Sequence, residues 1–131
     1  MVILFDQYNP PDDIFAIVFA TEQQIVVGRM LIDSMKAQGG EMGKTEMSLF
    51  ANQLHEGIKI PAKQAGPLKI GSASTLSYNK RQFYDRILTP MRAMGMIDYD
   101  VYRKKYKISN IFNNAMIKIG LMWVQEVRRP V

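Results

Sequence analysis

The sequence predicts one mainly α-helical domain with a small β-hairpin, an α+β fold, and three observations lead to this prediction. The chain has 131 residues, 47% of them hydrophobic, which suits a single globular domain. Apolar residues recur at intervals of three and four along most of the chain, as they do in amphipathic helices. Between Met96 and Ser109 the spacing changes to an alternation, which is typical of paired strands.

The first helical segment is expected to begin near residue 12. Tandem prolines stand just before it, and Asp12 or Asp13 can accept backbone N–H bonds as a cap. Thr21 offers a second start, so we expect one broken helix or two abutting helices. Gly39 and Gly40 suit the end of this segment because glycine tolerates the backbone of a helix terminus.

A second helix is expected from Thr45, a plausible N-cap, to Gly57. Residues 58–76 are then predicted to be irregular, because prolines, glycines and a serine–threonine cluster interrupt them. This segment carries Lys63 and Lys69, which we expect to contact phosphates.

A third helix is predicted over about residues 77–94, with Ser77 as its N-cap. Phe83, Ile87 and Met91 form its apolar stripe, and basic residues occupy the opposite face. Pro90 has no N–H, so we expect the last turn to kink or tighten.

The alternating segment, about residues 96–109, is predicted to be a hairpin with a turn at Tyr102-Arg103-Lys104. Asp98 and Asp100 are expected to face lysines across the hairpin rather than to bind a cation. A final amphipathic helix is expected from a cap at Ser109 to Arg129.

The charge is unevenly distributed along the chain. Residues 1–57 have a net charge of −5 and residues 58–131 a net charge of +10, which together give the formal +5. A basic surplus concentrated in one segment favours a polyanionic partner such as nucleic acid.

The composition argues against several other classes of protein. The chain has no cysteine, which excludes disulfides, thiolate metal sites and thiol catalysis. No nucleophile, base and orienting group cluster at a recognisable spacing, and His55 is the single histidine, so we expect no enzyme, no cofactor and no metal. The apolar run 14–20 is too short to cross a bilayer, so no membrane partner and a cytoplasmic location are expected.

The order of elements resembles the winged helix-turn-helix family, as in small prokaryotic or archaeal-type regulators. The resemblance rests on Lys44-Thr45-Glu46-Met47, Ser77-Tyr78-Asn79-Lys80-Arg81-Gln82-Phe83-Tyr84, Met94-Gly95-Met96-Ile97 and Tyr106-Lys107-Ile108-Ser109. It implies a single domain with an N-terminal extension (1–20), a winged-helix core (21–109) and a C-terminal helix (110–131). It also implies that the third helix enters the major groove while the hairpin, or wing, lies on the adjacent backbone. In that family the turn before the third helix is short, whereas here it spans residues 58–76.

The basic helix and hairpin supply the candidate DNA contacts. Cationic side chains that could position the backbone are Lys80, Arg81, Arg103, Lys104 and Lys105. Side chains that could read base edges are Asn79, Gln82 and Arg86. Ser77 and Tyr78 begin the helix and complete the candidate set, although Tyr78 could equally pack against the following turn.

The leading hypothesis is a transcription regulator or chromosome-associated factor that binds double-stranded DNA as a homodimer. The dimer interface is expected on the last helix, at Phe112, Met116, Ile119 and Trp123, although these residues could instead cover the core. The alternative is a protein-interaction subunit of a transcription or replication assembly. A third hypothesis is single-strand binding by stacking on Tyr99, Tyr102 and Tyr106, for which cross-strand packing is the simpler use.

Overall fold

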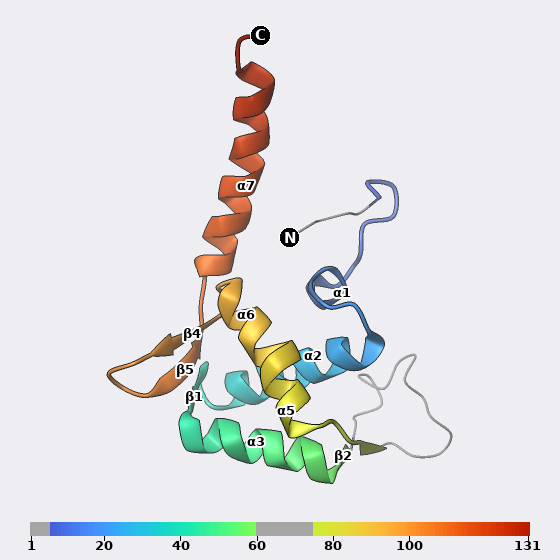
Figure 1. The fold of residues 1–131 in the computed structure, drawn as a ribbon, viewed down its shortest axis with the longest axis vertical. Helices are drawn as coiled ribbons and strands as arrows, with labels where there is room; N and C mark the ends of the chain where they lie inside the picture. Colours follow the sequence, from blue (N-terminus) through green and yellow to red (C-terminus); the bar gives the residue numbers. More distant parts are fainter. Residues whose placement is uncertain (1–5, 60–74) are drawn as a thin grey trace.

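The computed structural model describes residues 6–59 and 75–131, in which the chain is mainly helical with a small three-stranded antiparallel sheet (Figure 1). Most of the helices and the sheet form one body, and the last helix projects from it (Figure 1). In chain order, the elements are α1 (Ile14–Val18), α2 (Glu22–Ala37), β1 (Glu41–Gly43), α3 (Lys44–Glu56), β2 (Ile58–Lys59), β3 (Thr75–Leu76), α5 (Lys80–Phe83), the π-helix η2 (Tyr84–Leu88), α6 (Thr89–Ala93), β4 (Ile97–Asp100), β5 (Lys105–Ile108) and α7 (Ile111–Arg128).

The first helical segment is two abutting helices, as one of the two sequence alternatives predicted. Asp13 accepts a backbone N–H of the first turn of α1. Thr21 and Gln24 form a reciprocal capping box that begins α2. The side chain of Thr21 accepts the backbone N–H of Gln24, and the side chain of Gln24 accepts the backbone N–H of Thr21. Gly39 and Gly40 follow α2 with φ angles of 79° and 88°, which confirms the predicted helix end.

The strand β1 was not predicted. It pairs with β5 in the antiparallel register Glu41↔Lys107 and Met42↔Tyr106, so the sheet order is β1-β5-β4. Three residues are too few to show a strand period, and their partners lie far away in the sequence. Because β1 continues directly into α3, the N-cap of α3 is Gly43, and the predicted cap at Thr45 is wrong.

The segment 58–76 is not wholly irregular, contrary to the prediction. Its ends form the short antiparallel ladder of β2 and β3, with Ile58 opposite Leu76 and Lys59 opposite Thr75. This ladder closes the base of the long insertion. The C-terminus of α3 is therefore joined to the start of α5 much as a short turn would join them.

The third helix is continuous from α5 through η2 to α6, and its N-cap is Asn79 rather than the predicted Ser77. The sequence predicts a kinked or tightened last turn at Pro90, whereas in the structure the turn before Pro90 is a wider, π-helical turn. The N–H of Thr89 bonds to the carbonyl of Tyr84, five residues earlier. A wider turn relieves the clash that a proline ring makes with the carbonyl four residues before it, here that of Arg86.

The hairpin of β4 and β5 confirms the predicted change of period. Ile97 pairs with Ile108 and Tyr99 with Tyr106, and a four-residue turn joins the strands. The side chain of Asp100 holds this turn by accepting the backbone N–H groups of Tyr102 and Arg103, at 3.0 and 3.2 Å. The turn is longer than two residues, as expected where no glycine or asparagine is present.

One core joins the helices to the sheet. The fully buried side chains come from α2, β1, α3, the third helix and β4. They are Val27, Leu31, Met35, Met42, Met47, Leu54, Phe83, Ile87, Met91 and Ile97. The helix α1 joins this core through Phe15 and Phe19, whose rings stack against each other and cover Gly28 of α2. The predicted stripe of the third helix is thus the face that packs inward.

The first turn of α7 lies against Gly95, and from there the helix projects from the body. The carbonyl of Gly95 accepts the N–H of Phe112 at 3.1 Å, and Gly95 has a φ of 83°. A Cβ at this glycine would lie 2.7 Å from the side chain of Ile111, so both the conformation and the close approach require glycine. The N-cap of α7 is Asn110 rather than the predicted Ser109, although the hydroxyl of Ser109 accepts the N–H of Ile111.

Candidate nucleic-acid interface

The start of the third helix is fixed to the two helices before it. The hydroxyl of Ser77 donates to the carbonyl of His55 at 3.1 Å, and the side chain of Gln23 donates to the carbonyl of Ser77. The N–H of Tyr78 bonds to the carbonyl of Leu54 at 2.8 Å. These bonds set the direction of α5 relative to α2 and α3 whatever the length of the insertion.

Tyr78 is buried, with 5% of its surface exposed. Its burial raises the pKa of the hydroxyl, an effect that the nearby charge of Arg86 opposes. The packing alternative for this tyrosine is therefore the one the structure supports, and the ring is not presented to an external ligand.

Asn79 is engaged in capping the helix. Its side-chain oxygen accepts the N–H groups of Arg81 and Gln82 at 2.8 and 3.3 Å. Two of the unpaired N–H groups that a helix N-terminus could offer to a phosphate are thus already satisfied. The side-chain oxygen is also unavailable for a base edge unless the cap opens.

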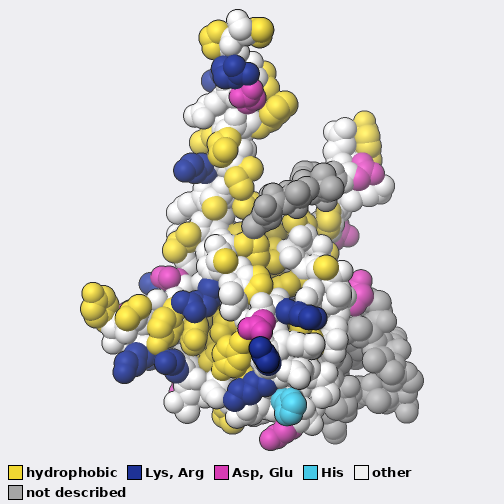
Figure 2. Space-filling model, viewed as in Figure 1, with side chains coloured by type: hydrophobic (Ala, Val, Ile, Leu, Met, Phe, Trp, Pro, Cys, Tyr) yellow, Lys and Arg dark blue, Asp and Glu magenta, His cyan; other side chains and the backbone are white. Residues whose placement is uncertain are grey.

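Four other predicted residues lie in the first two turns of the third helix, and none of them is buried. Lys80 is half-buried, and Arg81, Gln82 and Arg86 are exposed. The side chain of Arg81 is 91% exposed and lies 3.8 Å from Asp85, a weak surface ion pair. Figure 2 shows Lys and Arg side chains gathered over the face formed by the third helix and the hairpin.

The three predicted wing cations are not equivalent. Arg103 donates two hydrogen bonds of 3.0 Å to Glu41 of β1, and the Nζ of Lys105 lies 3.8 Å from the same carboxylate. The hydrogen bonds from Arg103 hold the pKa of Glu41 below its ordinary value, and the same bonds raise the pKa of Arg103. Arg103 and Lys105 are therefore partly neutralised within the chain. Lys104, at the exposed tip, forms no ion pair with any residue that the structure describes.

Arg92 is a residue of this face that the sequence did not single out. From α6 its guanidinium lies 5.3 Å from the ring centre of Tyr99 and 5.7 Å from that of Tyr106. It thereby fixes the hairpin against the third helix. Only a long-range contact reveals this role, because locally Arg92 is one more exposed base at the end of a basic helix.

The hairpin tyrosines divide into two kinds. Tyr99 and Tyr106 pack across the strands with ring centres 4.7 Å apart, and burial raises the pKa of Tyr106. Tyr102, in the turn, is 97% exposed. Two of the three rings therefore serve cross-strand packing, as expected, and one is free to meet a ligand.

Lys63 and Lys69, the predicted phosphate contacts of the insertion, lie outside the described residues. Asp98 lies opposite Lys107 and Asp100 opposite Lys105 across the hairpin, so the two carboxylates face lysines as expected. The described ranges contain no cluster of three or more His, Asp or Glu that could hold a metal ion. Within the same ranges, no helix is both long enough and apolar enough to cross a membrane.

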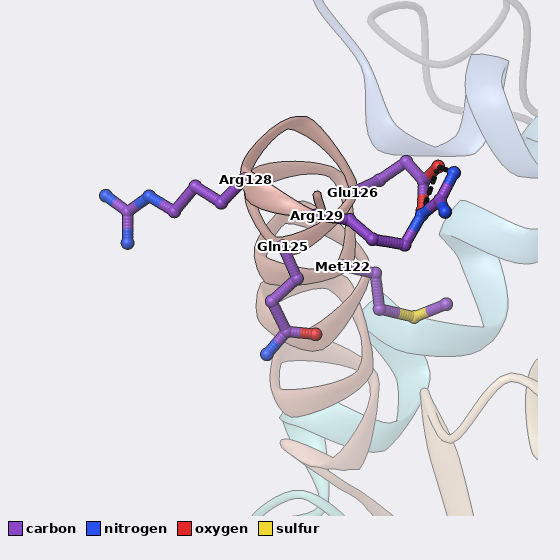
Figure 3. Close-up of a pocket in the computed structure, with 5 residues that line it drawn as sticks. All are labelled: Met122, Gln125, Glu126, Arg128 and Arg129. Atoms are coloured by element: carbon purple, nitrogen blue, oxygen red, sulfur yellow. Dashed lines mark hydrogen bonds and ion pairs between the residues drawn. The ribbon is translucent and has the colours of Figure 1, made fainter. Parts of the chain in front are cut away.

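The helix α7 contains no buried residue, so the alternative that it covers the core is wrong. Of the predicted interface residues, Phe112 and Met116 are half-buried near its base, and Ile119 and Trp123 are 45% and 69% exposed. At its end, Arg129 pairs with Glu126 at 3.0 Å, and Figure 3 shows Arg128 pointing away from this pair.

Comparison of the chain with protein families, with curated proteins and with solved structures found no match.

Proposed function

We propose that this chain is a winged-helix protein that binds double-stranded DNA, with the third helix (residues 80–93) in the major groove and the β4–β5 hairpin against the adjacent backbone. The observation that supports this most is the two-sided third helix. Phe83, Ile87 and Met91 are fully buried on one side, while Arg81 and Arg86 are exposed on the other. A rigidly held helix with a cationic outer face is suited to a groove lined by phosphates.

The roles within this face follow from which side chains are free. Lys80 and Arg81 are the proposed phosphate contacts, and Gln82 and Arg86 the proposed base contacts. Lys104 extends the contact to the wing, since its charge has no partner among the described residues. We propose that the protein acts as a transcription regulator or chromosome-associated factor.

A duplex is favoured over a single strand as the ligand. Sequence-independent binding of single strands relies on several aromatic rings in succession. Here Tyr99 and Tyr106 are packed against each other and against Arg92, which leaves Tyr102 as the exposed ring of the hairpin.

The test measures binding of random and selected DNA duplexes by fluorescence anisotropy at two salt concentrations. Lys80→Ala or Arg81→Ala is expected to weaken binding to every sequence and to reduce the salt dependence by about one released counterion. Gln82→Ala is expected to change which sequences are preferred. Lys118→Ala, which removes the same charge from α7, is the matched control and should change neither property.

Absent binding, or binding insensitive to salt, would contradict the proposal.

One observation favours a second candidate, a protein-interaction subunit of a transcription or replication assembly. Glu41 neutralises part of the wing charge, which weakens the wing as a phosphate site. A stoichiometric protein complex formed by a chain that shifts no DNA would support this candidate instead.

A further inference from the structure

The helix α7 has apolar side chains on almost every side and yet is exposed. Trp123 is 69% exposed, Val127 65%, and Leu121 on another side 55%. Figure 2 shows hydrophobic side chains along the visible length of this helix. A helix with so little polar surface is stable in water only when another element covers it.

The apolar residues on one side of α7 are arranged symmetrically about its centre. Five positions follow this side: Phe112, Met116, the pair Ile119–Gly120, Trp123 and Val127. Counted outward from the central pair, the next positions are three residues away in both directions, and the last are four residues further. The centre of the pattern is also the centre of the helix, Ile111–Arg128.

This symmetry matches the geometry of two antiparallel copies. A two-fold axis through the central pair places Phe112 opposite Val127 and Met116 opposite Trp123 of the second copy. It also places Ile119 beside Gly120, so that a large side chain meets a small one. In a parallel pair each residue would face itself, with Trp123 against Trp123 and glycine against glycine.

Gly120 supplies an independent reason for a close neighbour at the centre. Glycine is a poor helix former, and a Cβ added at Gly120 would meet nothing within 4 Å, so the chain's own packing does not require it. A crossing helix gives it a use, because the absence of a side chain lets two backbones approach closely.

The charges at the end of α7 also favour the antiparallel arrangement. Arg128 and Arg129 lie at its C-terminal end. Parallel helices would bring four arginines of two copies together, whereas antiparallel helices keep them apart and place opposite helix dipole ends side by side.

We propose that α7 pairs with α7 of a second copy in antiparallel orientation, crossing at Ile119–Gly120. The two bodies then lie at opposite ends of the helix pair. This pairing does not depend on the proposed DNA binding, and it is measured without DNA, so either proposal can fail alone.

Because the natural chain has no cysteine, single cysteines report the orientation directly. Ile119→Cys is expected to form a disulfide-linked dimer on mild oxidation. Phe112→Cys and Val127→Cys are each expected to stay unlinked alone but to link when mixed. The reason is that residues 112 and 127 are about 22 Å apart along a helix, and a disulfide needs Cβ atoms about 4 Å apart. Lys118→Cys, on the polar side, is the control for random collision.

Light scattering of the natural chain and two variants tests the interface itself. Trp123→Asp is expected to weaken the dimer at least tenfold, and Leu121→Asp, on another side of α7, to leave it unchanged. Circular dichroism checks that both variants keep the helical body. A monomeric natural chain, a Trp123→Asp dimer of natural affinity, self-linking of Phe112→Cys, or Lys118→Cys linking as fast as Ile119→Cys would each overturn the proposal.

Discussion

Glu41 partly neutralises the basic charge of the β4–β5 hairpin. It is the one acidic residue of β1, yet it accepts both hydrogen bonds of Arg103 and lies near Lys105. Sequence patterns could not predict this, because Glu41 and Arg103 are 62 residues apart. The sequence shows which residues of the hairpin are cationic, but the ion pairs of these residues depend on a strand that the sequence did not reveal.

The lowered pKa of Glu41 leads to a prediction for stability against pH. A carboxyl whose pKa is lower in the folded state stabilises the fold above its unfolded pKa, and this contribution is lost as the pH falls through the folded value. Glu41→Gln should therefore lower the urea midpoint at neutral pH, and the difference from the natural chain should vanish in acid. Urea titrations over a pH series measure this.

Glu56→Gln is the matched control, since Glu56 is exposed and forms no ion pair within the described residues. If the gap between Glu41→Gln and the natural chain stayed constant from neutral to acid pH, the ion pair would not be its cause.

Arg92 leads to a second prediction at the scale of one residue. Arg92→Met keeps the aliphatic stem but removes the charge that lies over Tyr99 and Tyr106. We expect a loss of about 0.5–1 kcal/mol in the free energy of unfolding, the usual size of an exposed cation–π contact. Chemical denaturation measures it, and Lys118→Met serves as the control. Equal stability of the two variants would show that the ring contacts contribute nothing.

At the scale of elements, local signals predicted most of the helices and the hairpin. The capping box at Thr21, the glycines after α2 and the alternation after Met96 all act within a few residues, and each gave the correct element. The ladders β1–β5 and β2–β3 escaped prediction because two or three residues carry no period and pairing partners are distant. The N-cap of the third helix is Asn79 and not the predicted Ser77, because the hydroxyl of Ser77 bonds to the carbonyl of His55 in α3 instead.

The β2–β3 ladder makes a prediction about the insertion between its strands. Replacing residues 60–74 by Asn-Gly should keep the fold, since Lys59 and Thr75 are already paired and this dipeptide favours a two-residue hairpin turn. The free energy of unfolding should stay unchanged or rise by at most about 2 kcal/mol, because a shorter loop costs less entropy. Thermal unfolding measures this.

The same variant tests the predicted phosphate contacts, because it lacks Lys63 and Lys69. Its affinity for duplex DNA should fall, and its salt dependence should decrease by about two counterions. Unchanged DNA affinity in a folded variant would remove both lysines from the proposed interface.

At the scale of the whole molecule, the body and α7 are energetically separable. No residue of this helix is fully buried, and Ile111 and Phe112 in its first turn lie against Gly95 of the body. A chain ending at Asn110 should therefore keep its helical circular dichroism, with a thermal midpoint within a few degrees of the dilute natural chain.

The two chains should differ in how they respond to concentration. If α7 pairs between copies, the midpoint of the natural chain rises with protein concentration, whereas that of the shortened chain does not. An unfolded shortened chain would contradict the separation of body and helix.

The pairing of β1 with β5 also bears on how fast the chain folds. It joins Met42 to Tyr106, positions 64 residues apart, while the helices and the β4–β5 hairpin form between near neighbours. Contacts between distant positions are slow to form because the intervening chain must first be ordered. We therefore expect the pairing of β1 with β5 to form last, after the β2–β3 ladder has shortened the path along the chain between these two strands.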